Sequence, residues 1–205
     1  WLKENEIQSK EFVNLIEDND SLELSELEKY KLLKYRLENS DLRKINNIKN
    51  NSNYWEENFT GKGVFPPKGS GLIEEDILEE RWNNLISAIY ATGEITKRSI
   101  EMQELEGEFY FSGKNLIQIE IGSLKYKTLM KGWLNHLYLS ANSSFNSKTL
   151  IISKKIDYSK KIIYEVSKEI CPINTQEATK ILTEIHLLAA AGRKNCWPIP
   201  PESGL

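Results

Sequence analysis

The sequence predicts a mixed α/β (α+β) fold, with a mainly helical lead-in over residues 1–93 and a sheet with flanking helices over residues 94–205. Two observations support this prediction. Up to residue 93, apolar residues recur three and four positions apart, the period of helices that bury one face. From residue 94 they alternate with polar residues, as in half-buried strands, and helical segments then separate the strand pairs. We therefore expect a single domain over residues 1–205.

The first helix is predicted from its start signal, because the first twenty residues are acidic and weakly patterned. Ser25 and Glu28 have the spacing of a capping box, in which a hydroxyl and a carboxylate satisfy free amides of the first turn. The Asn-rich residues 46–53 predict a loop or a weak helix. One mostly apolar face is predicted for the helix, formed by Leu27, Tyr30, Leu33, Lys34 and Leu37.

A second long helix is predicted after residues 61–71, where Pro66 and Pro67 among four glycines prevent regular structure. Ser70 is expected to cap this helix. The expected core positions are Ile73, Ile77, Leu85 and Ile89, and the expected solvent-facing positions are Glu74, Glu75, Glu79 and Glu80.

Residues 94–205 are predicted to form five strands and two helices. Three strands are expected at residues 94–102, 105–112 and 116–122, with a tight turn at residues 113–115. A helix opens at Ser123, and a second strand pair follows at residues 150–153 and 161–166. Asn174 and Glu177 predict another capping box, and Gly192 is expected to end that helix. The helix from Ser123 carries an apolar stripe of Leu129, Trp133, Leu137 and Ala141.

Composition limits the classes of function. The net charge of −3 and the pI of about 5.6 give no global positive field, so contact with nucleic acid would require a local patch. Two cysteines are too few for a disulfide scaffold and indicate a reducing compartment. No apolar stretch reaches the roughly 18 residues of a spanning helix. We expect a cytoplasmic protein without membrane contact, and the start at Trp1 indicates a fragment of a longer chain.

Common catalytic and metal-binding motifs are missing from the sequence. His136, His186, Cys171 and Cys196 lack the close pairing of zinc ligands. No G-x-S-x-G nucleophile motif is present. The glycines of residues 61–71 are in the wrong order for a P-loop, and the two prolines among them cannot donate amide hydrogen bonds.

Two groups of lysines are candidates for contact with DNA phosphates. Lysines near phosphates add salt-sensitive affinity, whereas on most proteins they form a solvated surface. The first group lies beside the helix that contains Trp133, and the second flanks the second strand pair. The candidates are Lys125, Lys127, Lys131, Lys154 and Lys155, with Lys160 and Lys161 beside the second group.

The strand order also suggests the restriction-endonuclease-like (PD-(D/E)xK) fold. Such nucleases place an acid on one strand and a D/E-x-K set on the next, so that the acids hold a divalent metal and the lysine positions water. Here the first acid is replaced by Tyr110. The triplet reads Gln118-Ile119-Glu120 or Glu120-Ile121-Gly122, and neither version has the lysine. The sequence predicts the nuclease-like fold with a degenerate active site, and no catalytic residue.

Four further segments lie at residues 22–30, 65–71, 129–141 and 200–204. The third contains Trp133, His136 and Leu137 in the order W-L-x-H-L, and the fourth contains Ser203 and Gly204 in the order P-x-S-G. Together they resemble the motifs of one known family, the C-terminal domain of the exodeoxyribonuclease V gamma subunit (RecC). Its W-L-E-H-L helix is the most specific match, although Asn135 replaces the usual Glu.

This resemblance implies a non-catalytic partner in an ATP-driven helicase–nuclease for double-strand break repair by homologous recombination. It implies a nuclease-like domain that lost its active site, guides or splits duplex and forked DNA, and docks RecB-like beta and RecD-like alpha subunits. No metal or cofactor is then expected in this domain, because ATP and Mg²⁺ belong to the partner subunits. It also implies a bacterial cytoplasmic protein, nucleoid-associated when acting on DNA.

Two alternatives stay open at this point. One is a metal-dependent nuclease with a migrated lysine, Lys125 or Lys127, and with Glu108 and Glu120 as metal ligands. It requires these groups to converge on one metal ion. The other is a pure protein-interaction domain that does not touch DNA.

Overall fold

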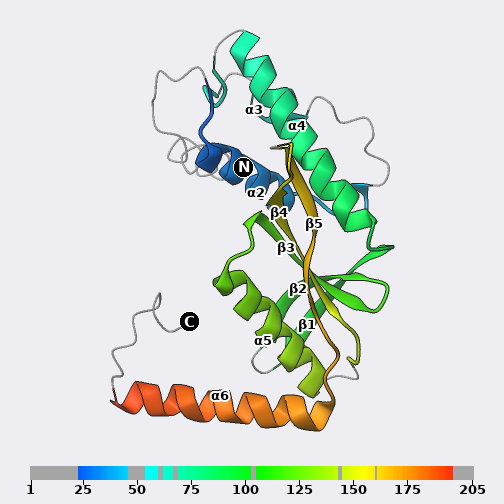
Figure 1. The fold of residues 1–205 in the computed structure, drawn as a ribbon, viewed down its shortest axis with the longest axis vertical. Helices are drawn as coiled ribbons and strands as arrows, with labels where there is room; N and C mark the ends of the chain where they lie inside the picture. Colours follow the sequence, from blue (N-terminus) through cyan, green and yellow to red (C-terminus); the bar gives the residue numbers. More distant parts are fainter. Residues whose placement is uncertain are drawn as a thin grey trace, which may run out of the picture. The chain divides into compact units, whose positions relative to one another are not determined.

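Two compact units make up the chain in the computed structural model (Figure 1). The structure describes residues 23–45, 54–59, 62–66, 69–102, 105–142, 145–159 and 161–195. Unit 1 comprises Trp1–Ser87 and Ile156–Ile163, and unit 2 comprises Ala88–Lys155 and Tyr164–Leu205. Each unit is described by itself.

Unit 1 is built on helices α2 (Glu26–Glu38), α3 (Tyr54–Phe59) and most of α4 (Gly69–Tyr90). The predicted capping box is confirmed: the Ser25 hydroxyl accepts from the amide of Glu28, and the Glu28 carboxylate accepts from the amide of Ser25. The Asn-rich residues 46–53 lie outside the described residues.

The predicted apolar face of α2 is confirmed at Leu33 and wrong at Leu27. The helix buries Leu32 and Leu33 together with Lys29 and Arg36, whereas Leu27 is 61% exposed. The pattern of apolar residues could not predict the burial of Lys29 and Arg36, because the acids that pair with them come from a helix distant in the sequence.

Those partners are acids of α4. The Lys29 ammonium lies 2.9 Å from a carboxylate oxygen of Glu74, and the Arg36 guanidinium lies 2.6 Å from Glu79. The prediction that Glu74 faces water is therefore wrong, since its side chain is 3% exposed. Buried charges are tolerated when they are paired.

Helix α4 begins earlier than predicted, and its predicted core is confirmed at Leu85 and Ile89 and wrong at Ile73. It starts at Gly69, so Ser70 lies inside its first turn and is not its cap. The buried side consists of Gly71, Glu74, Leu78, Trp82, Leu85 and Ile89, and Ile73 is 60% exposed. Gly71 fits this start, because an added Cβ there would clash with the carbonyl oxygen of Pro66. Only glycine lets the turn approach the helix so closely.

A five-stranded mixed sheet forms the centre of unit 2, with strands in the order β1-β2-β3-β4-β5. The strands are β1 (Ile95–Met102), β2 (Leu105–Ser112), β3 (Asn115–Ser123), β4 (Thr149–Ile156) and β5 (Ile162–Ile170). The β1–β2 and β2–β3 pairs are antiparallel, and β3–β4 is parallel. The five predicted strands are confirmed, and the last pair is several residues longer than predicted.

Helix α5 (Tyr126–Asn142) connects the parallel strands β3 and β4, as a parallel pair requires a crossover. The helix begins after the predicted Ser123, because Ser123 is still paired with Lys154 in the sheet. Leu137 in its predicted stripe is fully buried, and Leu129, Trp133 and Ala141 are half-buried. Gly132 faces the sheet, where an added Cβ would lie 3.1 Å from Ile151.

Helix α6 (Thr175–Asn195) packs its first half against α5 through Ala178, Leu182 and Leu137. Asn174 accepts from the amide of Glu177, so the predicted cap is confirmed. The predicted end at Gly192 is wrong, since the helix continues to Asn195. A glycine inside a helix costs only about 1 kcal/mol. The helix can therefore continue through Gly192 for three further residues. The tail predicted to be extended lies outside the described residues.

Candidate functional site

The two residues of β3 that the sequence predicts as degenerate nuclease positions, Gln118 and Glu120, face helix α5. The Glu120 carboxylate accepts from the Thr128 hydroxyl on α5 at 2.6 Å and from the Gly122 amide at 2.9 Å. Gln118, two residues earlier on the same face, has its Cγ 3.7 Å from where a Cβ of Gly132 would lie. Both oxygens of Glu120 therefore bind neighbouring protein groups, and Gln118 packs under the helix.

Tyr110 on β2 lies on the other face of the sheet. Phe111 packs with Leu116 and Leu139 on the α5 side, and Phe109 lies against the same cluster. Since side chains alternate along a strand, Tyr110 points away from α5. Its strand neighbour Lys97 places an ammonium 5.8 Å from the Tyr110 ring centroid. The structure thus brings Gln118 and Glu120 together but does not bring Tyr110 to them.

The same alternation separates the acids of the migrated-lysine alternative. Glu108 shares the face of Tyr110, where it forms an ion pair with Lys97. Glu120 faces α5. Two carboxylates on opposite faces of one sheet cannot ligate the same metal ion, so the geometry that this alternative requires is not met.

The first lysine group lies at the start of α5. Lys125, Lys127 and Lys131 are all exposed. Among the described residues, no hydrogen bond or ion pair holds any of their ammonium groups. They therefore form an unneutralised basic surface where β3 ends and α5 begins, and we call these three residues the α5 lysine cluster.

The second lysine group is less available. Lys154 is half-buried and engaged with neighbouring residues, and it is paired in register with Ser123 at the end of β3. Lys155 lies 2.6 Å from Glu165 on the neighbouring strand. Lys154 thus lies near the α5 lysine cluster at the carboxyl end of parallel strands, the edge where α/β sheets commonly bind ligands, whereas the charge of Lys155 is neutralised.

Two apolar side chains lie among these lysines, and the sequence reasoning missed them. Tyr126 is 71% exposed and Met130 is 39% exposed, four residues apart on α5. The signal was present in the sequence, because Tyr126, Met130, Trp133 and Leu137 continue one helical stripe. Only the structure shows that Tyr126 and Met130, at the start of this stripe, lie outside the core.

The residues of the W-L-x-H-L motif serve packing. Leu137 is fully buried and Trp133 lies against the cluster that Leu137 forms with α6. His136 is 1% exposed, and its Nδ1 lies 2.9 Å from the Thr149 hydroxyl at the start of β4. Burial lowers the pKa of His136, and the backbone of Cys171 acts weakly against it. Ser203 and Gly204, from the fourth motif, lie outside the described residues.

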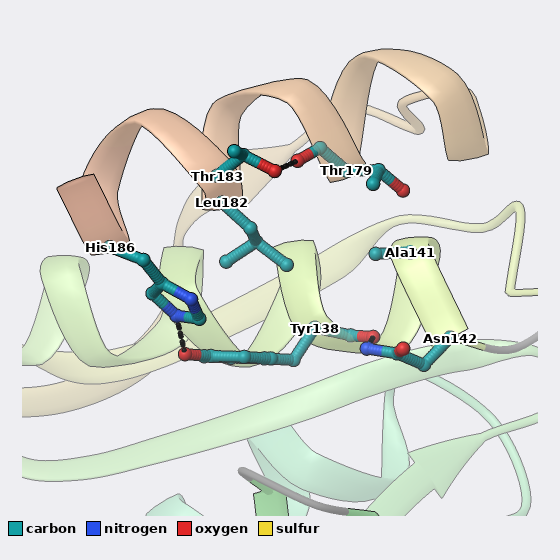
Figure 2. A pocket seen from close by; sticks show the side chains of 7 residues that line it. All are labelled: Tyr138, Ala141, Asn142, Thr179, Leu182, Thr183 and His186. Atoms are coloured by element: carbon teal, nitrogen blue, oxygen red, sulfur yellow. Dashed lines mark hydrogen bonds between the residues drawn. The ribbon is translucent and has the colours of Figure 1, made fainter.

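A shallow groove of about 230 Å³ lies between α5 and α6 (Figure 2). The Tyr138 hydroxyl lies 2.8 Å from Nε2 of His186. Thr183 donates to a backbone carbonyl of its own helix, as does Asn142. No Asp, Glu, Lys or Arg side chain lines this groove, so it offers no cationic group to bind an anion. The lining residues are Tyr138, Ala141, Asn142, Thr179, Leu182, Thr183 and His186.

Metal ligands do not gather in the part of the chain that the structure describes: no three His, Cys, Asp or Glu side chains are placed to hold an ion there. Cys171 is exposed, and Cys196 lies outside that part. Within the same residues, no helix has the length and apolar character needed to cross a membrane.

Among the comparisons with known proteins, a match to a family model includes all the residues of the candidate site. The family model of the RecC C-terminal domain matches residues 3–205, which include both units, β3, α5 and the motif residues. No curated protein matches the chain.

Proposed function

Because this chain belongs to the RecC C-terminal domain family, we propose that it is a non-catalytic scaffold that guides DNA and docks helicase subunits. Membership in the family indicates a role in the RecBCD complex, exodeoxyribonuclease V, and in DNA repair. The finer roles proposed are the guiding or splitting of forked duplex DNA and the docking of RecB-like beta and RecD-like alpha subunits. ATP and Mg²⁺ are assigned to those partners, and the site of action to the bacterial cytoplasm.

The order of elements supports a nuclease-like fold. Helix α4, the β1–β2–β3 meander, the α5 crossover and parallel strand β4 follow one another as in the restriction-endonuclease-like frame. A fold does not imply a function, because unrelated activities share folds. The residues on the frame must therefore carry the argument.

The observation that carries the proposal is the state of Glu120. Its two oxygens accept from Thr128 and Gly122, and among the described residues Glu120 belongs to no group of three His, Cys, Asp or Glu side chains placed to hold a metal ion. Glu120 ties the end of β3 to the first turns of α5. We infer that this carboxylate has a structural role.

A cleavage assay tests the absence of catalysis. The full chain is incubated with linear duplex DNA and Mg²⁺ or Mn²⁺, and we expect no cleavage above buffer. In the assembled complex, Glu120→Gln should leave the nuclease rate unchanged, as should the control Glu108→Gln on the other sheet face. Loss of cleavage with Glu120→Gln alone would refute the scaffold proposal.

The α5 lysine cluster supports contact with DNA phosphates, because each phosphate contact releases counterions and makes affinity salt-dependent. The triple charge reversal Lys125→Glu, Lys127→Glu and Lys131→Glu should weaken binding of forked DNA. It should also reduce the slope of log K against log salt by about 0.7–0.9 per lost contact.

A matched control separates this effect from net charge. Lys114, Lys168 and Lys180 are also exposed in unit 2 but lie outside the α5 lysine cluster. Their reversal to Glu changes the net charge equally and should leave fork affinity within about twofold. Equal losses for the two triple variants would mean that the cluster is not a specific contact.

A second candidate, a protein-interaction domain that does not touch DNA, is favoured by the far half of α6. Leu187 and Leu188 there are 66% and 59% exposed, which is unusual for adjacent large apolar side chains. Co-purification with the beta and alpha subunits tests it. Loss of a subunit with Leu187→Asn and Leu188→Asn, together with unchanged fork binding in the α5 lysine reversal, would favour this candidate.

A further inference from the structure

The first two turns of α5 carry an aromatic side chain in the middle of a basic surface. Residues four apart lie above one another on a helix. Tyr126 and Met130 therefore form one exposed row, and Lys127 and Lys131 form the row beside it. Lys125 precedes the first turn.

The orientation of these rows is fixed by the core. The row of Tyr126 and Met130 continues into Trp133, which packs against Leu137. Leu137 is fully buried. Helix α5 is further held by Thr128, which is bonded to Glu120 of the sheet. The helix therefore cannot rotate to bury Tyr126 without breaking these contacts.

The Tyr126 ring is open to a ligand. Its side chain is 71% exposed, and among the described residues no hydrogen bond or ring contact involves it. A rigid helix thus presents an unstacked ring, while the neighbouring ammonium groups have no described counter-charge. Such a combination is typical of single-strand binding surfaces, where bases stack on aromatic rings and the backbone lies along basic groups.

From these contacts we infer that the row of Tyr126 and Met130, with the α5 lysine cluster, binds an unpaired nucleotide of single-stranded DNA. The base stacks on Tyr126 against the apolar side of Met130, and its flanking phosphates meet Lys127 and Lys131. This inference rests on the proposed function and adds the class of ligand, because a base inside a duplex is already stacked and cannot cover the ring. Interface cores between proteins are enriched in Tyr and Met but depleted in lysine, so the three lysines around the ring favour DNA over a protein partner.

Binding of two oligonucleotides tests the inference. The full chain, with any subunits that it retains, is titrated with a fluorescent oligo-dT and with an abasic oligonucleotide of equal length, which keeps the phosphates but lacks bases. We expect Tyr126→Ala to weaken oligo-dT binding by at least about fivefold, the lower end of the effect of one stacked base. Abasic binding should stay within about twofold.

Tyr126→Phe is the matched control, because it keeps the ring and loses only the hydroxyl, and it should bind oligo-dT like the native chain. Substitution at so exposed a position should leave folding intact, which circular dichroism of each variant verifies. Stacking is refuted if Tyr126→Ala binds oligo-dT normally, or if it loses abasic binding equally. It is also refuted if Tyr126→Ala releases a protein subunit while single-strand binding is unchanged.

Failure of this inference is distinguishable from failure of the proposed function. If the triple reversal of the α5 lysine cluster weakens binding of both oligonucleotides and Tyr126→Ala weakens neither, the phosphate contacts stand and the stacking contact is excluded. If the triple reversal weakens neither, the DNA-binding role itself is wrong, and the stacking inference is excluded with it.

Discussion

The buried guanidinium of Arg36 offers a sharp test of the packing of unit 1. Its side chain is 3% exposed, and its central carbon lies 4.2, 4.9 and 4.4 Å from the ring centroids of Tyr54, Trp55 and Trp82. One oxygen of Glu79 accepts from Arg36 at 2.6 Å and from the Trp55 indole at 3.0 Å. One carboxylate thus neutralises the cation and joins α2, α3 and α4.

Replacing Glu79 with Gln keeps the shape and an acceptor oxygen but removes the charge. Removal of one partner from a buried pair costs about 3–5 kcal/mol, because the other charge stays buried without compensation. Because the Glu79 side chain is 21% exposed, water can partly compensate the Arg36 charge in the Glu79→Gln variant. We therefore expect a loss of about 3 kcal/mol. Arg36→Met should cost less, because Glu79 can hydrate once its partner is apolar.

Urea unfolding of the full chain, followed by tryptophan fluorescence, to which Trp55 and Trp82 contribute, measures these free energies of unfolding. Glu80→Gln is the control, since Glu80 is exposed on the same helix. It should change stability by less than about 0.5 kcal/mol. A loss below about 1 kcal/mol for Glu79→Gln would refute the reasoning, because the guanidinium would then not depend on its carboxylate.

Two further predictions concern pH and glycine. Because burial lowers the pKa of His136 below its model-compound value of 6.5, the folded state takes up its proton less readily than the unfolded chain. Its contribution is complete above pH 6.5 and is lost as the pH falls through the folded pKa, so the urea midpoint should fall more steeply from pH 7.5 to 5.5 in the native chain than in His136→Gln. Parallel slopes for the native chain and His136→Gln would contradict this prediction. Gly71→Ala should destabilise unit 1 by about 1–3 kcal/mol through the clash with Pro66, as overpacking does. Gly69→Ala, with open space at its Cβ, should be neutral or stabilising by up to about 1 kcal/mol in thermal unfolding, and equal losses at the two positions would refute the steric explanation.

The types of several elements were predicted correctly from local signals. The Ser25–Glu28 capping box, the change from helical to alternating period at residue 94 and the cap at Asn174 each depend on residues a few positions apart. Such signals are read without knowledge of the fold. The missing D/E-x-K lysine beside Glu120 is likewise a property of the sequence alone.

Which face of a helix is buried depends on residues that are distant in the sequence. Lys29 and Glu74 are buried because each finds the other across two helices, and neither residue type signals burial by itself. The start of α4 depends on the approach of Gly71 to Pro66, and the end of α6 on packing that tolerates Gly192. Patterns of apolar residues alone cannot anticipate these contacts.

For the candidate site, the residues present could be read from the sequence: a Glu without the D/E-x-K lysine and several lysines near the start of a helix. How these residues lie relative to one another depends on the packing of the whole unit. Alternation and strand register place Glu120 under α5 and Tyr110 on the opposite face. The packing of Leu137 against α6 leaves Tyr126 exposed among lysines that have no counter-charge within the described part of the chain. The reason is physical: composition and spacing constrain one element at a time, whereas the face that a side chain occupies depends on what the rest of the chain packs against it.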